Sequence, residues 1–190
     1  MNLHPKNTFH IVRHGKAKNN ELGIESCKLE TQKAYGLIPK GREIVSQESQ
    51  KYTDFDLIFS SPFRRTQETA AFFAETSNCE IILDDRLVDL DLGDLDLKSY
   101  ETSKSVTKQH PDPDYIYPNG GSFNQSLHRL TDFVTDINSK YEDKKILIVS
   151  HGFPCEALLD WANDIPLRNW EKCMEKGKVF PLKTQPYEKS

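Results

Sequence analysis

The sequence has no long apolar run, no excess of basic charge and no signal-peptide pattern. None of its apolar runs approaches the about 18 residues that a membrane-spanning helix needs. The formal net charge is -4, which gives no general attraction to nucleic acid or to an anionic membrane. The first residues, Met1 to Thr8, are polar and lack the apolar core of a signal peptide. We therefore expect a soluble, cytoplasmic protein that binds neither nucleic acid nor membrane.

The spacing of cysteine and histidine excludes further kinds of site. The four cysteines are widely separated and include no C-x-x-C pair. Scattered cysteines without a secretion signal are typical of reduced, structural thiols. The six histidines show neither H-x-H nor H-E-x-x-H spacing. The sequence therefore predicts no metal site, and it indicates no cofactor.

Short apolar runs alternate with longer amphipathic segments along the chain. Strands are predicted over residues 9–12, 56–59, 80–83 and 146–149, with a candidate edge strand over 178–180. Helices are predicted over residues 41–51, 64–75, 122–141 and 154–162. This alternation predicts an α/β fold with three layers, α/β/α, around a mainly parallel sheet. The 146–149 run is apolar throughout, as expected of a central strand covered on both faces.

Two segments interrupt this alternation. Residues 16–39 are polar and irregular, which predicts a long loop with at most a helical turn. Residues 94–121 contain acidic residues and prolines, and we predict an insertion with a little helix that covers the site. The chain of 190 residues is long enough for one sizeable core, so we predict a single domain over residues 1–190.

Two histidines follow predicted strands after one intervening residue. His14 comes after the first strand and His151 after the fourth, and a glycine follows each of them. In a parallel sheet the ligand lies beyond the carboxyl ends of the strands. Arg13 precedes His14 and offers a planar fork of donors suited to phosphoryl oxygens. An imidazole can attack phosphorus covalently, so the pattern indicates phosphoryl chemistry.

Four ordered blocks of the sequence resemble the histidine phosphatase superfamily, the phosphoglycerate mutase-like proteins. The blocks are Arg13–Gly15, Ser60–Ala70, Arg86–Gly93 and Val149–Gly152. A lone Arg-His-Gly would be weak, but four ordered blocks in the matching strand and helix context are specific. The resemblance implies a phosphatase that hydrolyses phosphomonoesters through a phosphohistidine intermediate, without a metal.

The resemblance also implies the catalytic residues. His14 would be the nucleophile, and His151 would assist it. Asp89, four residues before Gly93, would protonate the leaving group and later activate water. The family commonly has glutamate at this position, and aspartate is shorter by one methylene, about 1.5 Å. Asp91 is therefore kept as the alternative general acid.

The phosphate-binding residues follow from the same resemblance. Arg13, Arg65 and His151 would form the phosphate pocket, and Arg64 is a weaker candidate than Arg65. Asn20 matches an asparagine on the loop after the first block that reaches the phosphate. Two arginines at a helix N-terminus are unfavourable for the helix dipole unless an anion is bound, which supports a functional role.

Two features near the blocks depart from the usual family pattern. Lys16 and Lys18 stand where acidic or small polar residues are common, and we expect this basic pair to attract an anionic substrate. Before the long predicted helix, residues 120–122 read Gly-Gly-Ser, without the glutamate that the family often has. The second departure weakens the assignment to a subfamily more than the assignment to the superfamily.

Two other functions remain open. A phosphoglycerate mutase is the alternative enzyme, although residues 93–122 offer only three lysines for a bisphosphorylated cofactor, at positions 98, 104 and 108. A non-catalytic phosphate-binding or scaffold protein is the alternative outside enzymes. The expected partner is a small phosphorylated substrate, and a phosphoprotein is not excluded. Substrate identity and oligomeric state cannot be predicted from the sequence.

Overall fold

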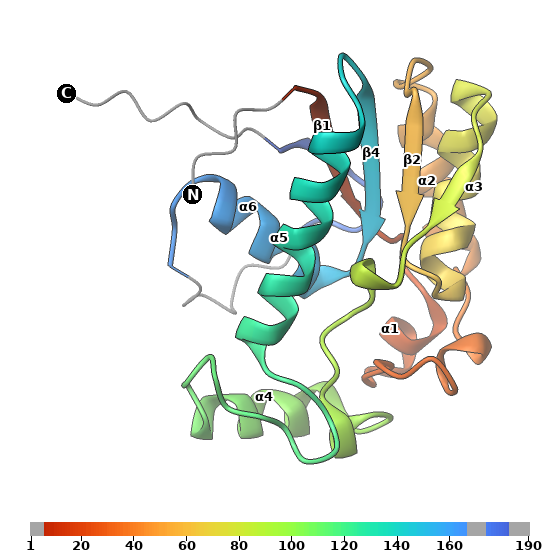
Figure 1. The fold of residues 1–190 in the computed structure, drawn as a ribbon. Helices are drawn as coiled ribbons and strands as arrows, with labels where there is room; N and C mark the ends of the chain where they lie inside the picture. The colour runs from red at the N-terminus through yellow and green to blue at the C-terminus, as the bar shows by residue number, and fades with distance from the viewer. Residues whose placement is uncertain (1–5, 167–173, 183–190) are drawn as a thin grey trace.

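The computed structural model describes residues 6–166 and 174–182, which form a five-stranded, mostly parallel sheet flanked by helices (Figure 1). The strand order is β3-β2-β4-β1-β5, and only β5 runs antiparallel to its neighbour. The strands are β1 (Thr8–Arg13), β2 (Leu57–Ser60), β3 (Ile81–Leu83), β4 (Lys145–Ser150) and β5 (Val179–Pro181). The α/β fold and mainly parallel sheet predicted from the sequence are confirmed.

The helices form the two outer layers. Residues 94–121, which we call the cover, add a helix at one end of the sheet. The helices are α1 (Lys18–Leu22), α2 (Pro39–Ser49), α3 (Arg64–Ser77), α4 (Tyr100–Gln109), α5 (Phe123–Lys140) and α6 (Gly152–Ala162). In Figure 1, α5 and α6 cover one face of the sheet and α2 and α3 the other, while α4 lies beyond the tips of the strand arrows. None of the helices in the described part of the chain is long and apolar enough to cross a membrane.

Strand β4 shows why the sheet is covered on both faces. Its side chains alternate between the faces, as the period of a strand requires. Ile146 and Ile148 pack in the apolar cluster with α5 and α6, whereas Leu147 and Val149 pack in the cluster with α2 and α3. All four side chains are fully buried. The prediction that this apolar run is the central strand is confirmed.

Helix α5 begins where the sequence predicts. The Ser122 hydroxyl accepts a hydrogen bond from the Gln125 backbone N at 3.2 Å, and the Gln125 side chain accepts one from the Ser122 backbone N at 3.0 Å. This reciprocal pair satisfies two N–H groups that a helix start leaves unpaired. Leu130 and Phe133 lie on the buried face of the helix. The helix therefore packs along the sheet and brings its N-terminus to the carboxyl ends of the strands.

The two irregular segments pack against each other at those ends. The 94–121 segment contains α4, as predicted, and the 16–39 segment contains α1 and a short 3₁₀ turn. An isolated antiparallel bridge joins Ile24 to Ser99, and the Tyr100 backbone N donates to the Gly23 carbonyl at 2.9 Å. A small apolar cluster lies beneath the cover, with Leu90, Leu92 and Tyr117 among its buried members. The cover is thus fixed to the loop that follows the first strand.

Candidate active site

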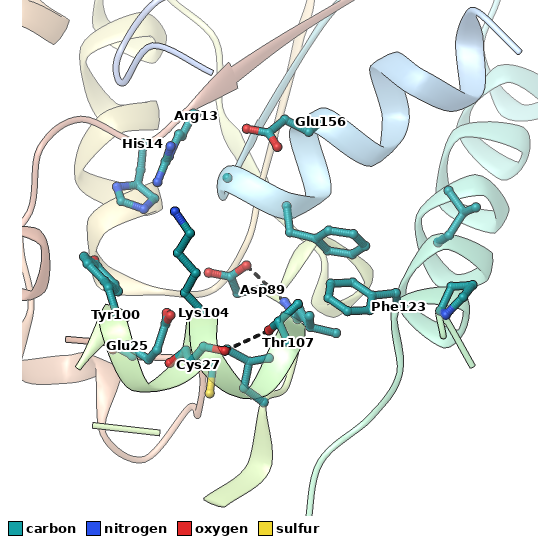
Figure 2. Close-up of a pocket in the computed structure, with 18 of the residues that line it drawn as sticks. Arg13, His14, Glu25, Cys27, Asp89, Tyr100, Lys104, Thr107, Phe123 and Glu156 are labelled. Atoms are coloured by element: carbon teal, nitrogen blue, oxygen red, sulfur yellow. Dashed lines mark hydrogen bonds between the residues drawn. The ribbon is translucent and has the colours of Figure 1, made fainter. Parts of the chain in front are cut away.

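Four loops meet at the carboxyl ends of the strands and bring the predicted side chains together, and Figure 2 labels Arg13, His14 and Asp89 among them. His14 follows β1, Arg65 lies in the first turn of α3 after β2, and His151 is the N-cap residue of α6 after β4. Asp89 lies in the loop after β3 and its following 3₁₀ turn. Because β2, β4 and β1 are adjacent in the sheet, residues distant in sequence converge at one edge.

His14 is buried and held in one tautomer. Its Nδ1 atom lies 2.8 Å from the Gly15 carbonyl oxygen, which can only accept, so Nδ1 carries the proton. The Nε2 atom therefore keeps its lone pair, and Arg65 Nε donates to it at 3.1 Å. Burial lowers the pKa of His14 well below 6.5, and the charges of Arg65 and Arg13 lower it further. The imidazole is therefore neutral at physiological pH.

Arg65 connects the parts of the site. Its side chain is only 1% exposed, although it carries a positive charge. Its Nε atom donates to His14, as described above. Its Nη2 atom donates to His151 Nδ1 at 3.0 Å and to the Ser26 carbonyl at 2.9 Å. The same Nη2 atom lies 3.4 Å from Asp89 Oδ2. One guanidinium thus fixes two imidazoles, a carboxyl group and the loop after β1.

The tautomer of His151 follows from this contact. Arginine has only donors, so the Nδ1 atom of His151 must accept, and Nε2 carries the proton. The Nε2–H group donates to the Ser61 hydroxyl at 2.9 Å. His151 is fully buried, which lowers its pKa well below 6.5, and the Arg65 charge lowers it further. The rings of His14 and His151 are 5.4 Å apart between centroids.

Asp89, and not Asp91, faces the cleft. Asp89 Oδ2 lies 3.5 Å from His151 Nδ1, and Oδ1 accepts from the Leu90 backbone N at 3.0 Å. Burial raises the pKa of Asp89 above 3.8, although Arg65 and Arg13 oppose this effect, so the carboxyl group keeps its proton to a higher pH than usual. The Asp91 side chain instead accepts from the Gly93 backbone N at 2.8 Å and does not line the cleft.

Arg13 lies beside His14 with an unused donor. Its Nη1 atom donates to the Met174 carbonyl at 3.2 Å, while its buried Nε atom has no hydrogen-bond partner in the described residues. A buried arginine N–H without an acceptor is unusual and is well suited to an anion. A Cβ atom at residue 152 would come within 3.1 Å of Arg13 Cζ. The glycine at Gly152 therefore gives the guanidinium room against the start of α6.

Asn20 and Arg64 differ in their placement. Asn20 lines the cleft, but its amide already accepts from the Ala17 backbone N at 3.0 Å and donates to the Tyr100 hydroxyl at 2.8 Å. A phosphate contact by Asn20 stays a prediction. Arg64 points outward and pairs with Glu68 at 2.8 Å. The structure therefore places the second arginine of the pair, Arg65, in the site.

The cleft around these residues has a volume of about 1650 Å³. Its lining includes the apolar side chains of Phe123, Leu127, Phe153 and Trp161. Its lysines are residues 104, 108 and 176, so the Lys16 and Lys18 pair expected to attract substrate does not line it. In residues 6–166 and 174–182, no three histidine, cysteine or acidic side chains are grouped to hold a metal ion.

Sequence reasoning missed several residues that shape this site. Ser26 and Ser61 contact Arg65 and His151, and neither forms part of a charged or periodic pattern. Tyr100 joins the cover to Asn20. Arg129 of α5 donates to the carbonyls of Val88 at 3.1 Å and of Asp89 at 3.3 Å, so it fixes the loop that carries Asp89. Its only sequence signal was a charged residue beside the buried face of α5.

Comparison with known proteins gives a consistent result. A family model described as the histidine phosphatase superfamily (branch 1) matches residues 9–188. The uncharacterized phosphatase PhoE of Bacillus subtilis is 30% identical over 149 residues, covering 78% of this chain and 74% of the relative. A probable phosphoglycerate mutase GpmB of an Enterobacter strain is 28% identical, covering 83% and 75%. The solved structure of Bacillus stearothermophilus YhfR superposes with a TM-score of 0.79 at 24% identity, covering 91% of this chain and 89% of that one.

Proposed function

The chain belongs to branch 1 of the histidine phosphatase superfamily, and on that premise we propose that it hydrolyses phosphomonoesters through a phosphohistidine on His14. The observation that carries the proposal is the hydrogen-bond arrangement of His14. Nδ1 is tied to the Gly15 carbonyl, and the Nε2 lone pair faces the donors of Arg65. A neutral imidazole held this way is a suitable nucleophile toward a phosphoryl group bound by guanidinium donors.

Binding of the phosphoryl group uses donors that surround His14. Arg65 offers its guanidinium from one side, and the unpartnered Nε of Arg13 offers another N–H. His151 accepts from Arg65 and donates to Ser61, so in this arrangement it holds the Arg65 guanidinium in place beside the donors that the two arginines offer. These donors are positioned before the reaction, so stabilising the charge of the transition state costs little reorganisation.

The first step transfers the phosphoryl group to the enzyme. His14 Nε2 attacks phosphorus, the bond to the ester oxygen breaks, and Asp89 gives its proton to the leaving alcohol. The raised pKa of Asp89, caused by burial, favours the protonated form that this step needs. In the second step Asp89, now a carboxylate, takes a proton from water, and the water oxygen displaces His14 to release inorganic phosphate.

A mutase remains the second enzymatic candidate, because the GpmB relative matches at nearly the same identity as the phosphatase relative. A mutase would need to hold a bisphosphorylated cofactor during turnover. Only three lysines of the described residues line the cleft, and several of its other lining side chains are apolar, which favours hydrolysis. Mutase activity that depends on added bisphosphoglycerate and exceeds hydrolysis would reverse this order.

The proposal is tested with a panel of metabolite phosphates and one aryl phosphate. We compare the wild type with His14→Ala and with His128→Ala, whose histidine is exposed on α5. We expect His14→Ala to lose at least about 10³-fold in kcat, and His128→Ala to keep its rate. Rapid quenching should trap an acid-labile phosphoenzyme in the wild type and none in His14→Ala. Vanadate binding without any turnover would favour the non-catalytic alternative.

A further inference from the structure

Glu25 places a carboxyl group in the cleft, and no lysine, arginine or histidine of residues 6–166 and 174–182 forms an ion pair with it. The residue lines the cleft, and the Ser103 hydroxyl lies close enough to its carboxylate to lower its pKa. Asp89, by contrast, lies next to both Arg65 and His151. Arg65 and Arg13 act on Glu25 only through space. A carboxylate taken from water without a paired cation is unfavourable, so a cationic group of a ligand would be stabilised there.

The backbone holds Glu25 firmly in this position. Its N–H donates to the Lys98 carbonyl at 2.9 Å, and its own carbonyl accepts from the Leu97 backbone N at 3.3 Å. The neighbouring bridge between Ile24 and Ser99 continues this pairing. Glu25 thus lies at the junction between the loop after β1 and the start of α4. Hydrogen bonds of its own N–H and carbonyl groups fix the backbone from which its side chain extends.

The charges around Glu25 are mixed. Burial raises the pKa of Glu25 to about 7, and the negative charge of Asp89 raises it further, while Ser103, Arg65 and Arg13 oppose the rise. Tyr100 of α4 also faces it. The carboxyl group is therefore about half ionised near neutral pH, and a bound cation would favour its ionised form.

Lys104 does not supply the missing cation. It follows Ser103 on α4 and also lines the cleft. Figure 2 shows the Lys104 side chain extending toward Arg13 and His14, whereas Glu25 lies beside Tyr100 at the other end of that side chain. A phosphoryl group between His14 and Arg13 would attract Lys104. Glu25 would face the alcohol half of the substrate, on the side of Asp89.

We propose that Glu25 binds a protonated amine of the substrate, so that the preferred substrates are phosphomonoesters of amino alcohols, including O-phosphorylated amino acids. The inference rests on the proposed phosphatase function, because the amine must belong to the alcohol that Asp89 protonates. Glu25 and Asp89 are separate groups of the same cleft, so a linker would join the amine to the ester oxygen. Two carbons, as in phosphoethanolamine, is the shortest stable case.

The test compares two substrates that differ only in the charged group. Phosphoethanolamine carries the ammonium, and 2-hydroxyethyl phosphate has a hydroxyl in its place. The ratio of their kcat/KM values measures selection for the amine. We expect the wild type to prefer the amine by about tenfold or more, as a hydrogen bond between charged groups provides, and we expect Glu25→Gln to bring the ratio close to one.

Two further variants separate this effect from general changes. Glu30→Gln removes the same charge from an exposed residue of the same loop, outside the cleft, and should keep the wild-type ratio. Glu25→Asp keeps the charge and should restore part of the preference. The wild-type ratio should also rise from about pH 6 to 8 as Glu25 loses its proton, whereas the ratio of Glu25→Gln should stay flat.

The results distinguish this inference from the phosphatase proposal. If an aryl phosphate is hydrolysed in a His14-dependent way while the wild-type amine ratio is close to one, the role of Glu25 is wrong and the phosphatase stands. If the wild type and Glu25→Gln give the same ratio of kcat/KM values for the two matched substrates, the role of Glu25 is likewise wrong and the phosphatase stands. If neither the aryl phosphate nor the matched pair is turned over, both proposals are overturned.

Discussion

The Nε atom of Arg65 donates to the Nε2 atom of His14 across 3.1 Å. The donor is therefore aligned with the one ring nitrogen of His14 that has a free lone pair. A phosphoryl oxygen arriving at that nitrogen would find the same N–H within reach and would replace Nε2 as its acceptor. The proposed nucleophile and a proposed phosphate donor are thus positioned by a single contact.

We predict that Arg65→Lys lowers kcat/KM by about 10²- to 10³-fold. A lysine ammonium has no planar fork and cannot contact His14, His151 and the Ser26 carbonyl together. The matched control is Arg64→Lys on the same helix, since Arg64 is exposed and should be replaceable within about twofold. Steady-state kinetics with an aryl phosphate, together with thermal melts of both variants, provide the measurement. A larger loss in Arg64→Lys would show that the wrong arginine was assigned.

We predict that Asp89, and not Asp91, is the general acid. Asp89→Asn should lose about 10²- to 10⁴-fold in kcat with alkyl phosphates, whose alcohols need a proton to leave. The loss should be smaller with p-nitrophenyl phosphate, whose phenolate leaves without one. Asp91→Asn should keep the rate but melt at a lower temperature, because it weakens the hydrogen bond from the Gly93 backbone N. Equal leaving-group sensitivity in the two variants would contradict the assignment.

The pH dependence of kcat/KM should have an alkaline limb that belongs to Asp89. Burial, partly opposed by Arg65, raises the pKa of Asp89 above 3.8, so the active acid form is lost as the pH rises through that higher value. Burial and the Arg65 charge lower the pKa of His14 well below 6.5, so the nucleophile stays neutral into mildly acidic solution.

A profile from about pH 4 to 9 checks this expectation. The substrate phosphate itself ionises at about pH 6. The pH profile of kcat/KM for the wild type is therefore compared with that of Asp89→Asn on the same substrate. The variant should lack the limb that Asp89 causes and retain the limb that comes from the substrate. The same alkaline limb in the wild type and in the variant would assign it elsewhere.

A stability prediction concerns the cover. Leu97 has a φ of 63°, a left-handed conformation that is costly for leucine, and its side chain is 44% exposed. Leu97→Asn should raise the free energy of unfolding by about 0.5–1 kcal/mol, because asparagine tolerates this conformation. Leu29→Asn, at a similarly exposed position without positive φ, controls for the loss of an apolar surface group. Denaturant unfolding of both variants measures the difference, and equal changes would attribute the effect to hydrophobicity alone.

The sheet and the strand-end histidines could be predicted from the sequence because their signals are local. The 146–149 run is apolar at every position, and each histidine follows a predicted strand by one intervening residue and precedes a glycine. The helix of residues 64–75 was also predicted, and its phase decides that Arg65 points inward while Arg64 points to solvent. Periodicity alone does not rank the two arginines, and the preference for Arg65 came from the family resemblance.

The parts that escaped prediction depend on contacts between distant residues. Nothing near Glu25 in the sequence shows that it pairs with the Lys98 backbone, and nothing near Arg129 shows that it fixes the carbonyl of Asp89. Irregular segments such as 16–39 have no repeating pattern from which side-chain directions follow. Their conformation is set by mutual packing, which is why the cover and its polar lining could not be predicted.

Strand β1, which leads directly into His14, lies between β4 and β5, and both of these neighbours come from the last quarter of the chain. On the ribosome, β1 must therefore wait until residues 145–150 have been synthesised before β4 is available as its partner. Contacts of such high sequence separation slow folding, because a long loop must close before they form. The proposed phosphate site should then form only after β4 has been synthesised, and nascent chains that stop before β4 should bind no phosphate.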